Sequence, residues 1–83
     1  MNEVRISGEI LDYYDVEVVK QISEKYGFAH IDALRKFLAS KTYAMLTDAR
    51  YGMCQFGPPG IFDIWESEQI TGDPRNSVYI RED

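Results

Sequence analysis

The chain has 83 residues, with 14 acidic against 9 basic side chains and a net charge of −5 at pH 7. A chain of this length builds a single hydrophobic core, so we expect one small helical domain over residues 1–83, with residues 1–8 and 76–83 loosely attached. The hydrophobic content of 45% excludes a disordered chain. The acidic excess repels phosphate backbones and membrane surfaces, so it disfavours nucleic acid and a membrane as partners.

The cysteine content and the absence of a long apolar run bear on location. The single Cys54 cannot form an intramolecular disulfide. No basic-then-apolar leader and no membrane-spanning run are present in the sequence. We therefore expect a cytoplasmic protein.

The first predicted helix runs from about residue 9 to residue 26. At about 100° per residue its apolar side chains share one face; they are Leu11, Tyr14, Val18, Val19, Ile22 and Tyr26. Gly27 follows as a stop signal, because glycine readily adopts the left-handed conformation that ends helices.

A second helix is predicted from about residue 31 to residue 46. Its apolar stripe consists of Ile31, Leu34, Phe37, Leu38, Thr42, Met45 and Leu46, and Tyr43 faces outward. A competing interpretation ends this helix near Ala39 and makes Ser40 the N-cap of a short following helix. The stripe stays in phase across the join, which favours one continuous helix.

The third predicted helix begins at Pro58 and Pro59 and stops at Gly72, before Asp73-Pro74. Residues 53–56 are expected to form a short extended piece, and residues 77–80 have β propensity and can pair with it. The fold class is therefore mainly α, a three-helix domain to which that short β pairing can be added. The predicted core contains Val18, Ile22, Leu34, Phe37, Leu38, Met45, Ile61, Phe62 and Trp65.

The chain lacks a constellation of catalytic or metal-binding residues. His30 and Cys54 fall in unrelated segments, whereas acid–base and nucleophilic catalysis need paired groups. Asp63 and Glu66 are interpreted as a solvated helix face, with Glu68 turned toward the apolar side, rather than as a divalent-ion site. We therefore expect no enzyme activity, no catalytic residue, no cofactor and no metal.

One long stretch is similar to a known group of sequences. The run KYGFAHIDALRKFLASKTYAMLTD, followed by FGPPGIFDIWESE, resembles small bacterial proteins grouped as a domain of unknown function. In these proteins a helix ending in KYG leads to an ALRxFxxSKTYxML-like stretch and then to an acidic amphipathic helix, and the likeness covers about Val18 to Glu68. The resemblance implies a helical fold and a bacterial origin, and it assigns no activity to any residue. Some such proteins look like companions of toxin-type genes, which is compatible with an acidic binding partner.

The leading functional hypothesis is a non-catalytic protein-interaction module that self-associates and regulates a partner protein. Tyr43, Asp63 and Glu66 are its candidate partner-binding residues, because acidic side chains suit a basic partner and tyrosine is enriched at interfaces. We expect several tyrosines to lie at a twofold contact; the candidates are Tyr13, Tyr43, Tyr51 and Tyr79.

The alternative hypothesis is a helix-turn-helix-like DNA-binding or antitoxin-type regulator. Residues 16–38 have the rhythm of two helices joined at a glycine turn. Arg35, Lys36 and Lys41 would then contact phosphates. The net charge of −5 opposes this, because counterion release drives most DNA affinity.

Overall fold

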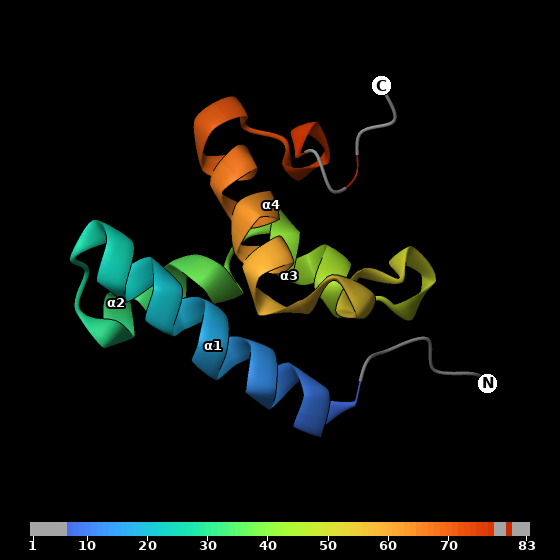
Figure 1. Ribbon diagram of the computed structural model, residues 1–83, viewed down its shortest axis with the longest axis horizontal. Coiled ribbons are helices and arrows are strands. Elements are labelled where there is room, and N and C mark those ends of the chain that lie inside the picture. The colour runs from blue at the N-terminus through green and yellow to red at the C-terminus, as the bar shows by residue number, and fades with distance from the viewer. Residues whose placement is uncertain (1–6, 78–79, 81–83) are drawn as a thin grey trace.

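The computed structural model describes residues 7–77 and residue 80, and this part of the chain is mostly helical (Figure 1). The α-helices among these residues are α1 (Gly8–Tyr26), α2 (His30–Leu38), α3 (Lys41–Leu46) and α4 (Gly57–Thr71). Short 3-10 helices form η1 (Ala49–Tyr51), η2 (Met53–Phe56) and η3 (Pro74–Asn76). The mainly-α fold class predicted from the sequence is confirmed.

Helix α1 begins and ends as its sequence predicts. The Ser7 side chain accepts a hydrogen bond from the Ile10 amide, which gives the first turn a partner. Gly27 ends the helix with a φ of 72°, and its amide donates to the Ser23 carbonyl. The buried face of α1 carries Tyr14, Val18, Val19 and Ile22.

Residues 31–46 do not form one continuous helix, so that prediction is wrong. Helix α2 ends at Leu38, and Ser40 adopts extended backbone angles before α3 begins. The Ser40 hydroxyl accepts from the Tyr43 amide at 3.0 Å and donates to the Phe37 carbonyl at 2.6 Å. These two bonds satisfy backbone groups on both sides of the break. The competing interpretation, with Ser40 as an N-cap, is confirmed.

Leu38 is 43% exposed, so its predicted place in the core is wrong. The chain leaves α2 directly after Leu38, and this short helix buries only the side that carries Ala33 and Phe37. Leu34, Met45 and Phe62 are half-buried and pack against the core. The other predicted core residues are buried, namely Val18, Ile22, Phe37, Ile61 and Trp65.

Residues 53–56 form the 3-10 helix η2, so the extended piece expected there is wrong. Gly52 and Gly57 flank η2 with φ angles of 63° and 76°, which close it into a tight turn. The Tyr14 hydroxyl donates to the Cys54 carbonyl and accepts from the Gly57 amide at 3.1 Å. Helix α1 thereby occupies backbone groups that a β pairing would need.

The chain ends lie partly outside the described residues. Residues 1–6, 78–79 and 81–83, which were expected to be loose or to pair as a strand, are not among them. Within the described part, Gly8 begins α1, and Ser77 is buried and donates to Asp63 at 2.7 Å. None of the described helices is long and apolar enough to cross a membrane.

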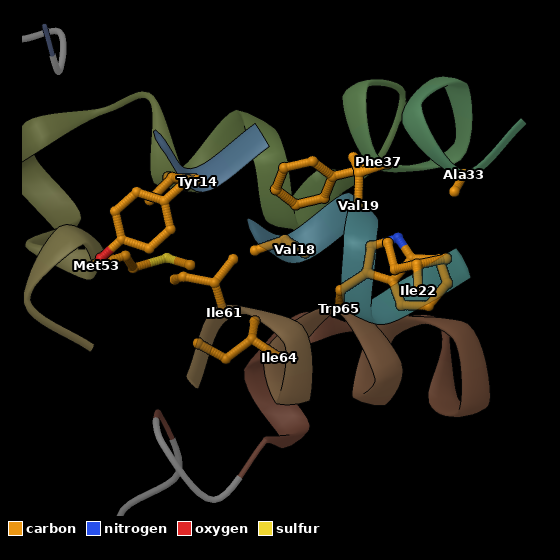
Figure 2. Close-up of a cluster of buried hydrophobic side chains, with 11 residues drawn as sticks. Tyr14, Val18, Val19, Ile22, Ala33, Phe37, Met53, Ile61, Ile64 and Trp65 are labelled. Atoms are coloured by element: carbon orange, nitrogen blue, oxygen red, sulfur yellow. The ribbon is translucent and has the colours of Figure 1, made fainter. Parts of the chain in front are cut away.

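Helix α4 is the element around which the others pack. It contacts α1, α3, η2 and η3, and in Figure 1 it runs steeply across the direction of α1. Figure 2 shows side chains from α1, α2 and α4 pointing toward one another in the core. Helix α4 contributes three buried side chains to the core, those of Ile61, Ile64 and Trp65. Helices α2 and α4 therefore share with α1 one hydrophobic core (Figure 2).

Candidate partner-binding groove

A groove of about 260 Å³ lies between α1 and α2, which pack against each other. On α1 its lining residues recur at the three- and four-residue spacing that places side chains on one side of a helix. On α2 they are one turn apart. We call this feature the acidic groove, and its lining residues are Asp12, Asp15, Val16, Val19, His30 and Leu34.

The described residues place no cation beside Asp15 that would neutralise its charge. Its Oδ1 atom is buried and accepts no hydrogen bond from the described part of the chain. Burial raises the pKa of Asp15, and the nearby Asp12 charge raises it further. A carboxylate beside apolar walls without a donor is unfavourable. The acidic groove therefore presents negative charge that a positively charged ligand would stabilise.

Tyr43 brings α3 to the same region. Its side chain is half-buried rather than facing outward, and its ring packs edge-to-face on Phe37 with centroids 5.1 Å apart. Burial raises the pKa of Tyr43, and the charges of Asp15 and Asp12 raise it further. The phenol thus lies within electrostatic reach of both groove carboxylates.

Exposed apolar side chains occur in the acidic groove and, on α2, at helical spacing from its residue Leu34. Val16 lines the groove and is 58% exposed. On α2, Ile31 and Leu38 flank Leu34 at helical spacing, and they are 54% and 43% exposed. Large apolar side chains gathered beside charge on a surface are typical of a contact site for another molecule.

The two α4 carboxylates predicted as partner-binding residues lie apart from Tyr43 in the chain and serve internal contacts. Asp63 accepts the Ser77 hydroxyl, and Glu66 accepts from Lys25 at 2.6 Å and from the Tyr26 hydroxyl. Burial alone would raise the pKa of Glu66, but these two hydrogen bonds outweigh it and lower the pKa. A solvated helix face was expected here. Instead, these carboxylates form hydrogen bonds and an ion pair that join α4 to the end of α1 and to the segment after η3.

Glu68 has a structural role that the sequence analysis missed. Its carboxylate accepts from the amides of Lys41 and Thr42, both at 2.9 Å, and from the Thr42 hydroxyl at 2.7 Å. These amides belong to the first turn of α3 and have no partner within their own helix. The position of Glu68 toward the apolar side of its helix was the available signal.

Asp12 and Asp15 were also missed as site residues. Both flank the apolar stripe of α1, where Asp12 is three residues before Asp15 and seven before Val19. Carboxylates at the edge of a buried stripe were the signal in the sequence. Their place in a groove cannot be predicted from α1 alone, because α2 forms the other side of the groove.

The cations of the DNA-binding alternative are divided between two elements. Arg35 and Lys36 are exposed on α2, and the Lys36 ammonium lies 4.9 Å from the centre of the Phe28 ring. Lys41 begins α3 and donates to the Gly72 carbonyl at 3.1 Å, at the end of α4. Only Arg35 and Lys36 therefore belong to the α1–α2 pair.

Two smaller hollows lie elsewhere on the described surface. One, of about 220 Å³, has the aromatic walls Tyr26, Phe28 and Trp65, with Lys36 at its edge. The other, of about 210 Å³, is lined by Lys41 and by Arg75, whose guanidinium is bonded to Asp73 at 3.1 Å. Neither is lined by a carboxylate that lacks a partner among the described residues, although the buried Trp65 Nε1 atom beside the aromatic hollow also has no acceptor there. The acidic groove is therefore the stronger candidate for a positively charged ligand.

The chemistry of the acidic groove is set by its lining residues. It combines two carboxylates, an imidazole and apolar walls, and the described residues contain no group of three or more side chains placed to hold a metal ion. Comparison of the chain with family models, curated proteins and solved structures gave no match.

Proposed function

We propose that the protein is a non-catalytic interaction module that binds a partner protein through the acidic groove and thereby regulates it. The observation that supports this most is the Asp15 carboxylate, which is held beside Asp12 without a hydrogen-bond donor to Oδ1 from the described residues. A fold keeps such a group at a cost to its stability, and binding sites are where this cost is commonly found. The exposed Val16 adds apolar contact area to the same site.

Site-specific photo-crosslinking in the cells that produce the protein tests this function. A photoreactive amino acid at Val16 reports contacts of the acidic groove, whereas the same residue at Ile70, which is 80% exposed near the aromatic hollow, serves as the control. We expect a discrete protein adduct from position 16 that is absent from position 70. The adduct should be lost when Asp12 and Asp15 are changed to Asn. No adduct from position 16, or the same adducts from both positions, would contradict the proposal.

Self-association and a cytoplasmic location belong to the same proposal. Tyr13 and Tyr51 are 57% and 56% exposed, and tyrosine is a favoured interface residue, while Tyr79 lies outside the described residues. The single cysteine, Cys54, requires no oxidising compartment. Sedimentation at micromolar concentration should give a dimer mass, and a monomer mass would remove self-association from the proposal.

The alternative function is a DNA-binding or antitoxin-type regulator that uses the α1–α2 pair. The left-handed Gly27 between the two helices and the exposed Arg35 and Lys36 on α2 favour it. A gel shift on random duplex DNA separates the two functions. An interaction module should give no shift at physiological salt. A salt-sensitive shift that disappears in the Arg35→Ala/Lys36→Ala variant would favour the alternative, because lost phosphate contacts weaken binding to every sequence.

A further inference from the structure

The acidic groove makes two chemical demands on whatever occupies it. Its walls include Val16, Val19 and Leu34, which favour apolar contact. Its half-buried carboxylate, Asp15, has an Oδ1 atom without a donor among the described residues and lies near the charge of Asp12, so it favours a positively charged donor. An occupant must therefore carry both properties on one surface.

A neutral donor would meet only part of this demand. A backbone amide or a hydroxyl can donate to a carboxylate but leaves its charge uncompensated, and two carboxylates that raise each other's energy make this worse. A Lys or Arg side chain supplies charge and donors together, and its aliphatic stem can lie along the apolar wall. Because Asp15 is half-buried, a cation entering the acidic groove is better shielded from water than one at an open surface.

The size of the groove and the spacing of the apolar side chains beside it favour a helix over a small ligand. Its volume of about 260 Å³ lies below the range of roughly 300–1,000 Å³ that is usual for small-molecule sites. Apolar side chains instead follow one another along α2, where Ile31, Leu34 and Leu38 recur at helical spacing. A helix that lies in a groove presents its own side chains at the same spacing.

We propose that the acidic groove receives a basic amphipathic helix of a partner protein, whose Lys or Arg pairs with Asp12 and Asp15 while its apolar side chains pack on Val16 and Leu34. The inference rests on the proposed interaction function and names the chemistry of the partner. Charge complementarity selects this occupant for the acidic groove over a second copy of the chain, since the groove carboxylates favour a positively charged surface and the chain carries a net charge of −5.

Two synthetic peptides test the basic helix. The first is a capped helical peptide with leucine and arginine on one face, and the second replaces each arginine by citrulline, which keeps the shape and removes the charge. Methyl resonances of Val16, Val19 and Leu34 report where each peptide binds, and calorimetry gives the affinity. The test variant is Asp12→Asn/Asp15→Asn. The control variant is Glu24→Gln/Asp32→Asn, which changes the net charge equally at exposed positions that do not line the groove.

We expect the arginine peptide to shift the groove methyl resonances and to bind about tenfold or more tightly than the citrulline peptide. Asp12→Asn/Asp15→Asn should remove most of this difference, and the control variant should retain it. Equal affinity for the two peptides, shifts confined to residues outside the groove, or no binding would overturn the basic helix. The interaction function is decided separately, by the adduct from position 16. A crosslink from that position to a second copy of the chain would also overturn the basic helix.

Discussion

The ionised Asp15 side chain lowers the stability of the fold, and we propose that it contributes to partner binding. The pH dependence of stability measures the first of these effects. Burial raises the pKa of Asp15 in the folded state. A raised carboxyl pKa contributes stability that is fully present below the unfolded pKa of about 3.9 and is lost as pH rises through the folded value. At neutral pH the ionised Asp15 therefore lowers the free energy of unfolding.

Asp15→Asn should accordingly raise the melting temperature at neutral pH. The gain should shrink as pH falls through the raised pKa of the folded state, and it should be absent below the unfolded carboxyl pKa of about 3.9, because the wild-type side chain is then neutral as well. Melting curves of both proteins across this pH range test the expectation, with Glu24→Gln as the control at an exposed position. If Asp15→Asn lowered the melting temperature at neutral pH, Asp15 would be a stabilising residue and the case for the groove would weaken.

Glu68 is a second residue whose side chain affects the stability of the fold. Removing its carboxylate leaves the amides of Lys41 and Thr42 and the hydroxyl of the buried Thr42 without their acceptor. Glu68→Ala should lower the free energy of unfolding by about 1–3 kcal/mol. Glu68→Gln keeps one acceptor oxygen and should lose less. Urea unfolding measures both changes, and an unchanged midpoint for Glu68→Ala would show that water replaces the carboxylate without loss.

At the scale of elements, the break between α2 and α3 predicts that Ser40→Ala lowers the stability of the protein. A continuous helix would predict that the same substitution raises it. Ser40→Ala removes both hydrogen bonds of the Ser40 hydroxyl and should destabilise the protein by about 1 kcal/mol. Alanine inside a continuous helix would instead stabilise it by a few tenths of a kcal/mol. Ser40→Thr keeps the hydroxyl and should stay close to wild type. Chemical denaturation distinguishes the two signs.

The elements also show what the sequence can and cannot predict. Helices α1 and α4 follow from long apolar patterns ended by Gly27 and Gly72, because both signals are local. Apolar periodicity favours a continuous helix through Ser40, because it does not register that Glu68, many residues later, accepts the first amides of α3. The acidic groove was not predicted for the same reason: it exists only where α1 and α2 pack together.

At the scale of the whole molecule, Phe37 and Leu38 are neighbours in the chain but contribute unequally to the free energy of unfolding. Phe37 is fully buried, whereas Leu38 is 43% exposed. Phe37→Ala should destabilise the protein by about 3–5 kcal/mol, a large part of a small domain's total. Leu38→Ala should cost about 1 kcal/mol or less. Thermal melts of the two variants check this order, and equal losses would mean that Leu38 is packed in solution.

The central position of α4 also has a consequence for the order in which the chain is made. A ribosome releases α1, α2 and α3 before it reaches Ile61, Ile64 and Trp65, the α4 residues that complete the core. Until those residues emerge, Val18, Ile22 and Phe37 lack the partners that cover them. Because domains fold as units, the nascent chain gains most of its stability only once α4 has left the exit tunnel, and its apolar surface is open to chaperones and other nascent chains until then.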